Sequence, residues 1–166
     1  NKFASGNITV SNSTISGNSA KDGSGIHNGG TLNISNSTLS GNISSRFGGS
    51  IINNGALTIS NSTFSSNSAQ YGGGIFNNSG TLSISSSTFS SNAASTNGGG
   101  IFFGGSAQAS SIANTIIANS VSGGDVVQAG TVGLLGAATK ANNLVTQGTF
   151  SWATTVTSAQ LNLGPL

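Results

Sequence analysis

The sequence predicts an all-β fold, a right-handed parallel β-helix of five to six coils, with three short strands and about 25 residues per coil. Three observations predict it. Segments 8–18, 32–42, 57–67 and 82–92 nearly superimpose, and the threonine within each recurs after steps of 24, 25 and 25 residues. Apolar and polar residues alternate within each segment, as in strands that are buried on one face. The right-handed turn follows the strong preference of parallel crossovers.

The first strand of each coil is expected to point two apolar residues inward. In the third copy Leu57 and Ile59 alternate with Thr58 and Ser60, and this period of two places the apolar pair on one face. The same pair recurs in every copy, at Ile8/Val10, Leu32/Ile34, Leu57/Ile59 and Leu82/Ile84.

The second strand is expected to follow a bend at Asn61 and Ser62, because short polar side chains bond to nearby backbone groups. It points Phe64 inward, with Thr63 and Ser65 outward. Aliphatic or aromatic residues fill the inward position in all copies: Ile15, Leu39, Phe64, Phe89 and Ile116.

The third strand is expected after a turn over residues 66–70 and the glycines 72–74, which permit backbone torsions or close approaches that a Cβ would block. Its inward position is always isoleucine, at Ile26, Ile51, Ile75 and Ile101. The position after it varies, and this tolerance predicts that it faces outward; it holds His27, Ile52, Phe76 and Phe102.

An asparagine closes each second-strand segment and is expected to fall on a turn. Side-chain amides stacked in this way can bond to one another along the axis and satisfy backbone groups of the turn. The sequence therefore predicts a structural asparagine ladder formed by Asn18, Asn42, Asn67, Asn92 and Asn119.

The second strand also predicts a flat outward face of hydroxyls, with coils about 4.8 Å apart. A solvated sheet explains such a face, because threonine favours strands. The alternatives are ice binding and a docking face for glycans or for a neighbouring solenoid. A weaker copy at 111–119 places Thr115 in the threonine register. The possible binding or packing ladder consists of Thr14, Thr38, Thr63, Thr88, Ser16, Ser40, Ser65 and Ser90.

The domain organisation is read as one β-solenoid domain over residues 1–166. Residues 8–120 hold the regular repeats, and residues 121–166 are expected to form irregular last coils or a cap, since terminal repeats of solenoids are atypical. Trp152 is expected to cover that end, and Pro165 to help stop the stacking because it cannot donate to a ladder.

Composition excludes several classes of function. Charged residues make up 4% of the chain, against roughly a quarter in an average protein, and four scattered cations do not form a nucleic-acid footprint. No apolar run reaches the length of about 20 residues that spans a bilayer, so no membrane insertion is expected. The evenly spaced Leu, Ile and Phe argue against disorder, and the chain has no cysteine.

Catalysis is not expected. β-Helix enzymes that act on polysaccharides need paired carboxylates, a basic catalyst or a calcium site. Asp22 and Asp125 are the only acidic residues and are predicted to lie about four coils, or roughly 20 Å, apart. One histidine, His27, cannot complete a convincing triad. No cofactor and no metal are predicted.

Short motifs in the chain resemble the paired repeats of polymorphic outer-membrane proteins. GGGI occurs at 72–75 and 98–101, and FSSN at 64–67 and 89–92. The chain is also similar to other bacterial extracellular β-helix proteins, including autotransporter passengers. The resemblance implies secretion, display on the bacterial cell surface and often adhesion.

These observations predict a non-catalytic, extracellular structural or adhesive β-helix segment, the stalk or passenger of a surface protein. The alternatives are a self-assembling filament subunit and an ice- or glycan-binding solenoid. The expected partners are the chain itself, by end-to-end or side-by-side stacking, or glycans on host or neighbouring cells.

Overall fold

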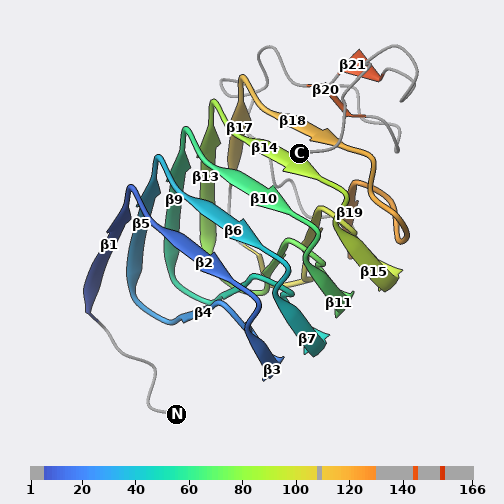
Figure 1. The fold of residues 1–166 in the computed structure, drawn as a ribbon, viewed down its shortest axis with the longest axis horizontal. Helices are drawn as coiled ribbons and strands as arrows, with labels where there is room; N and C mark the ends of the chain where they lie inside the picture. The colour runs from blue at the N-terminus through green and yellow to red at the C-terminus, as the bar shows by residue number, and fades with distance from the viewer. Residues whose placement is uncertain (1–5, 108–109, 130–143, 146–153, 156–166) are drawn as a thin grey trace.

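The computed structural model describes residues 6–107, 110–129, 144–145 and 154–155. These residues form a stack of parallel coils that runs from the blue coil at the left of Figure 1 to the orange one at the right. They contain strands and no helix. The all-β parallel solenoid with about 25 residues per coil is thus confirmed. Most of the expected cap, including Trp152 and Pro165, lies outside the described residues.

Four parallel sheets run along the stack and are named here sheets A to D. Sheet A consists of β1 (Asn7–Ser11), β5 (Thr31–Ser35), β9 (Ala56–Ser60), β13 (Thr81–Ser85) and β17 (Ser111–Ala113). Sheet B consists of β2 (Thr14–Ser16), β6 (Thr38–Ser40), β10 (Thr63–Ser65), β14 (Thr88–Ser90), β18 (Ile116–Ala118), β20 (Leu144–Val145) and β21 (Thr154–Thr155). Sheet C consists of β3 (Ser19–Asp22), β7 (Ile43–Phe47), β11 (Ser68–Tyr71) and β15 (Ala93–Asn97). Sheet D consists of β4 (Ile26–Asn28), β8 (Ile51–Asn53), β12 (Ile75–Asn77), β16 (Ile101–Phe103) and β19 (Val126–Gln128).

The regular coils contain four strands where the sequence predicted three. The additional strand is the one in sheet C, and β11 (Ser68–Tyr71) occupies most of the segment that was expected to turn. Its pairing with β7 shifts register between Ser68 and Tyr71. A register shift breaks the alternation of inward and outward side chains, so the segment carries no period-two signal in the sequence.

The bends between strands follow the predicted chemistry. Asn61 adopts a left-handed backbone with φ of 47°, a conformation that asparagine tolerates better than most residues. Ser62 Oγ donates to the Ser60 carbonyl at 2.7 Å. Gly72 has φ of 67°, and a Cβ on Gly73 would lie 2.3 Å from the Ala93 carbonyl oxygen. Glycine is therefore required where neighbouring coils touch backbone to backbone.

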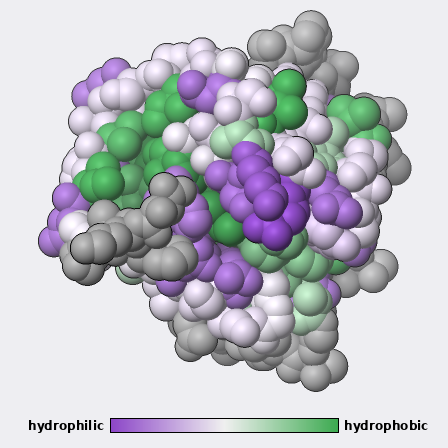
Figure 2. All heavy atoms as spheres, turned by 90° about the horizontal axis from the view of Figure 1, so that it is seen from below, coloured by the Kyte–Doolittle hydropathy of each residue, from purple (hydrophilic) through white to green (hydrophobic). Residues whose placement is uncertain are grey.

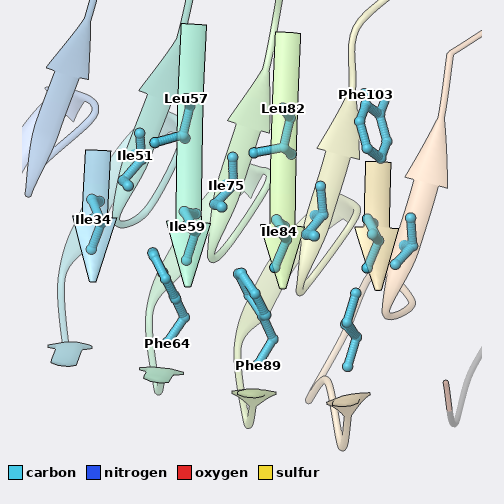
Figure 3. Close-up of a cluster of buried hydrophobic side chains, with 14 of the residues drawn as sticks. Ile34, Ile51, Leu57, Ile59, Phe64, Ile75, Leu82, Ile84, Phe89 and Phe103 are labelled. Carbon is cyan, nitrogen blue, oxygen red and sulfur yellow. The ribbon is translucent and has the colours of Figure 1, made fainter. Parts of the chain in front are cut away.

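The main core is a narrow column of apolar side chains inside the coils (Figure 3). The predicted inward residues of coils two to four are buried there, and Phe64 stacks on Phe89 with ring centroids 4.5 Å apart. Each buried Leu, Ile or Phe side chain contributes about 1.5–3 kcal/mol of hydrophobic stabilisation. The column includes Leu32, Ile34, Leu39, Ile51, Leu57, Ile59, Phe64, Ile75, Leu82, Ile84, Phe89 and Ile101.

The fifth coil is out of the predicted register by one residue. Phe89 pairs with Ile117 and Thr88 with Ile116, so Ile117 is the inward residue and Ile116 is only partly buried. The reason is the long connection from β16 (Ile101–Phe103) to β17 (Ser111–Ala113), which lengthens this coil. The prediction that Ile116 fills the core position was wrong, because it aligned Thr115 with Thr88, whereas Thr88 pairs with Ile116.

A second apolar cluster lies outside the main column, between sheets C and D. Its buried members Ile52, Phe76 and Phe102 pack with Phe47 and Tyr71 of sheet C. These are residues from the position that was expected to face outward. They do point away from the main core, yet they are at most 8% exposed because the sheet C aromatics cover them. The predicted direction therefore holds for Ile52, Phe76 and Phe102, but their burial was not predicted, while His27 is exposed.

Candidate functional site

The asparagine ladder is buried and hydrogen-bonded from coil to coil. Asn67 Oδ1 accepts the backbone N–H of Asn42 at 3.0 Å and its side-chain Nδ2 at 3.0 Å. Asn67 in turn donates to Asn92 Oδ1 and to the Leu39 carbonyl. Asn42, Asn67 and Asn92 are completely buried. The ladder thus satisfies polar backbone groups that could not reach water.

Asn119 does not extend this ladder. It has φ of 56° and takes the place of Ser91, which has φ of 55° and donates its N–H to Ala118. Ser120 takes the ladder position, and its backbone N–H donates to Asp125 Oδ1 at 3.0 Å. The cause is the same one-residue shift of the fifth coil. Asp125 is completely buried and supplies an acceptor within its own coil.

A serine ladder lies at the bend between sheets A and B. The backbone N–H of Ser37 donates to Ser62 Oγ at 3.1 Å, and the N–H of Ser62 donates to Ser87 Oγ at 3.2 Å. Thr115 joins this ladder, because its Oγ1 donates to the carbonyl two residues back as the serines do. It does not belong to the outward threonine ladder, contrary to the predicted register. The signal for this ladder was the serine that directly precedes the outward threonine in four coils, at Ser13, Ser37, Ser62 and Ser87.

A second asparagine ladder runs along sheet D. Asn28 Nδ2 donates to Asn53 Oδ1, and Asn53 Nδ2 donates to Asn77 Oδ1, both at 2.7 Å. All three residues are buried, and Phe103 occupies the same register position in the fourth coil. This ladder was not predicted, although an asparagine recurs in three coils two residues after the inward isoleucine of the third predicted strand.

The outward ladder of sheet B is in the predicted register over four coils. Thr14, Thr38, Thr63 and Thr88 pair in sequence, as do the four serines two residues later. In the first coil both residues are exposed, whereas the threonines of later coils are half-buried and Ser90 is 5% exposed. The openness of this face therefore falls from coil one to coil four.

The outer face of sheet A is wider and more open. Its strands are five residues long in the first four coils and present three outward positions each. Asn33, Thr58, Thr81 and Ser83 are all exposed. No residue of the five sheet A strands is charged. The result is a regular surface of hydroxyls and amides, which was not among the predicted binding faces.

The described exposed charges gather on sheet C. Arg46 binds Asp22 of the preceding coil through two hydrogen bonds of 2.9 and 2.7 Å, and its guanidinium lies 4.6 Å from the centre of the Phe47 ring. The hydrogen bonds from Arg46 lower the pKa of Asp22, against a smaller opposing effect of desolvation. Lys21 is exposed on the same strand as Asp22. In Figure 2, strongly hydrophilic side chains cluster near the centre of the view.

Asp22, His27 and Asp125 lie in different parts of the solenoid. Asp22 is in sheet C and is bound by Arg46, while Asp125 is buried in the fifth coil. His27 lies in sheet D, with Nε2 3.1 Å from the Asn54 amide. Within the described ranges no three His, Cys, Asp or Glu side chains gather as metal ligands. The same residues include no helix suited to crossing a membrane.

Comparison with known proteins agrees with this geometry. The family model described as "Right handed beta helix region" matches residues 3–159. The chain belongs to the right-handed β-helix family. This assignment supplies the hand of the solenoid that the sequence predicted. No curated protein and no solved structure matches this β-helix chain.

Proposed function

We propose that this β-helix is a non-catalytic, secreted segment of a bacterial cell-surface protein, serving as an adhesive stalk or passenger. The observation that carries the proposal is the uncharged face of sheet A. Its exposed hydroxyls and amides keep one register from β1 (Asn7–Ser11) to β13 (Thr81–Ser85). A partner with its own regular array of hydroxyls fits such a face, so the proposed ligands are neutral glycans of host or neighbouring cells.

Rigidity supports adhesion by this face. The sheet A backbone is held by parallel pairing on both sides in the central coils and by the serine ladder at its bend. Binding to a preorganised surface loses little conformational entropy. Uncharged hydroxyls also cost less to desolvate than charged groups do. A repeated array then adds many weak contacts, which raises the avidity for a polymeric ligand.

The test is glycan-array and whole-cell binding by the purified chain. The double variant Asn33→Lys/Thr58→Lys places two charges on sheet A, and Thr38→Lys/Thr63→Lys is the matched control on sheet B. We expect the sheet A variant to lose binding to neutral glycans at least about tenfold and the sheet B variant to retain it. Equal binding by all three proteins, or release of reducing ends from a bound glycan, would contradict the proposal.

The threonine columns favour ice binding as a second candidate. Thr14, Thr38, Thr63 and Thr88 lie in register along sheet B, and regular rows of threonine offer a methyl and a hydroxyl at each step. The variant Thr63→Tyr disrupts the row and should abolish thermal hysteresis without unfolding the coil. Thermal hysteresis that survives Thr63→Tyr would remove this candidate.

A further inference from the structure

The outer face of sheet A has one column of side chains that is more open than the columns beside it. The middle residue of the strand is exposed in each of the first four coils, whereas the residue two positions later is half-buried from the second coil to the fourth. The residue two positions earlier is Ala56 in the third coil, so that column lacks a polar group there. The middle residues pair in register and form what we name the central column: Thr9, Asn33, Thr58 and Ser83.

The central column has unused hydrogen-bonding capacity. Within the described chain no side-chain hydrogen bond is found for Thr9, Asn33 or Thr58, and Ser83 Oγ accepts one from Ser111 Oγ at 3.0 Å. The buried Asn67 differs, because its amide is bonded to the coils on both sides. A hydroxyl or a side-chain amide both donates and accepts. The exposed groups of the central column are therefore available to a partner outside the chain.

The spacing of these groups gives the face a direction. Along a strand, outward positions lie about 6.7 Å apart, and the chain bends just beyond the strand at Asn36 and Asn61, with φ of 49° and 47°. Along the stack, the polar groups recur about every 4.8 Å from one sheet A strand to the next (Figure 1). One pyranose ring of an extended, equatorially linked polysaccharide advances by nearly the coil spacing. Consecutive sugars of such a chain therefore meet consecutive coils in the same way.

The size and charge of the face favour a chain of sugars over a protein partner. The strands are five residues long in the first four coils, which makes the face about 16 Å wide. The described strands offer a face of roughly 400 Å², about half of the ~800 Å² that a stable protein interface buries on each partner. None of these strands carries a charge, so an ionised polysaccharide finds no opposite charge on them.

We propose that the sheet A face binds an extended, neutral, equatorially linked polysaccharide that lies parallel to the solenoid axis, with one sugar per coil over the central column. The hydroxyls of each sugar exchange hydrogen bonds with the hydroxyl or amide of the coil beneath it. A coiled or branched glycan loses this register after a few sugars. The inference rests on the proposed glycan-binding function and adds the shape of the ligand and its direction on the face.

The first experiment compares two series of neutral oligosaccharides built from the same sugar. Cello-oligosaccharides are extended and malto-oligosaccharides coil, and isothermal titration calorimetry measures the affinity for each chain length. We expect the affinity for the extended series to rise roughly threefold per added sugar and then to level off. The coiled series should bind at least about tenfold more weakly at equal length. Equal affinity for the two series would overturn the inference and leave glycan binding by sheet A in place.

The second experiment lengthens the face by one coil within the solenoid. A copy of residues 57–81 is inserted directly after Thr81, and because Leu57 and Leu82 hold the same register position, the added coil continues every column. We expect the affinity for the extended series to level off at a length one sugar greater than in the parent chain. Circular dichroism during thermal unfolding checks that the lengthened chain is folded. An unchanged levelling-off length would mean that the ligand does not follow the axis, which overturns the inference.

Matched controls within the added coil identify the face. Thr58→Lys in the added coil alone should return the levelling-off length to that of the parent chain, whereas Thr63→Lys there, on sheet B, should leave the gain of one sugar intact. The opposite result would place the ligand on sheet B and overturn the assignment to the central column. Absence of binding to any glycan would overturn both this inference and the proposed function. Growth in mass with concentration in light scattering, abolished by Asn33→Lys/Thr58→Lys, would overturn the inference in favour of a second copy as occupant.

Discussion

The asparagine ladder and the outward threonine ladder make an instructive comparison, since they run side by side with the same period. Thr63 and Asn67 are four residues apart, and each pairs with an identical residue in the coil before and after. Asn67 is fully buried and bonded on both sides, whereas Thr63 is half-buried and no side-chain hydrogen bond is found for it in the described chain. The same repetition therefore accompanies two different physical roles.

The difference shows how to interpret a polar repeat. A buried polar side chain must be satisfied, because an unpaired group costs about 1–3 kcal/mol. An asparagine column inside a turn is thus explained by folding alone. An exposed polar column can bond to water, so folding requires nothing of it beyond strand propensity. Function is therefore better sought on the open faces, and the following substitutions test this division from the largest expected effect to the smallest.

The substitution Asn67→Ala should have the largest effect. It leaves the Asn42 N–H and Nδ2 and the Leu39 carbonyl without the partner they have now. We expect the free energy of unfolding to fall by about 3 kcal/mol or more. Urea unfolding followed by circular dichroism measures it. A loss below about 1 kcal/mol would mean that water replaces the amide and that the ladder is not essential.

The substitution Ser62→Ala should have an intermediate effect. Ser62 Oγ accepts the backbone N–H of Ser37, so its removal leaves one buried donor unpaired. We expect a loss of about 1–2 kcal/mol in the same urea measurement. The control is Ser65→Ala on the outward face of sheet B, which should be nearly neutral. Similar losses of unfolding free energy in the two variants would mean that the buried and the outward serine contribute equally to stability, contrary to the distinction between buried and exposed columns.

The substitution Thr63→Ala should change stability little. The outward threonine contributes strand propensity and no ladder hydrogen bond, so we expect a loss of about 0.5 kcal/mol. The same urea measurement on Thr63→Val, which keeps the branched shape without the hydroxyl, should give a value closer to that of the parent chain. A loss comparable to that of Asn67→Ala would show that the outward column is part of the structural framework.

The smallest effect should come from the ion pair on sheet C. Arg46 lowers the pKa of Asp22 in the folded chain, chiefly through its hydrogen bonds. A lowered folded pKa means that the contribution is present above the unfolded value, about 3.9, and is lost as pH falls through the lower folded value. Thermal unfolding should therefore show Asp22→Asn converging with the parent chain below about pH 4.

Salt provides the control for this last prediction. The Arg46 side chain is 46% exposed, and exposed ion pairs are weakened by added salt. We expect the difference between Asp22→Asn and the parent chain at pH 7 to shrink in 1 M NaCl. A difference that persists in high salt would point to the packing of Arg46 on Phe47 as the contribution that matters.

Much of the architecture was predictable because the same types of residue recur at the same positions of each coil. The columns of Leu57, Ile59, Phe64 and Ile75 identified the core, because only apolar side chains fit a dry interior. The strands of sheet C were missed, since their register shift removes the alternation that marks a strand. The burial of Phe76 was not predicted, because the ring that covers it is that of Phe47, a residue of the previous coil.

The candidate sites were likewise predicted only in part. The threonine and serine columns were predicted in register through four coils, and Asn18, Asn42, Asn67 and Asn92 form the ladder expected for them. The prediction that Asn119 joins the ladder was wrong. The short sequence match at 111–119 did not fix the number of residues in the connection between β16 and β17. The open face of sheet A and the hydrogen bond from Ser120 to Asp125 were not predicted, because the local pattern of residues specifies neither.

The sequence by itself determined the solenoid, its period and the residues of its core, because each coil must bury the same few positions and the chain repeats them. The tertiary structure alone decided which polar columns are buried and where the aromatic cluster outside the core is covered. These properties depend on contacts between residues about 25 positions apart. A local sequence pattern specifies to which face of the strand a side chain points. Only the neighbouring coils specify which residues that side chain contacts.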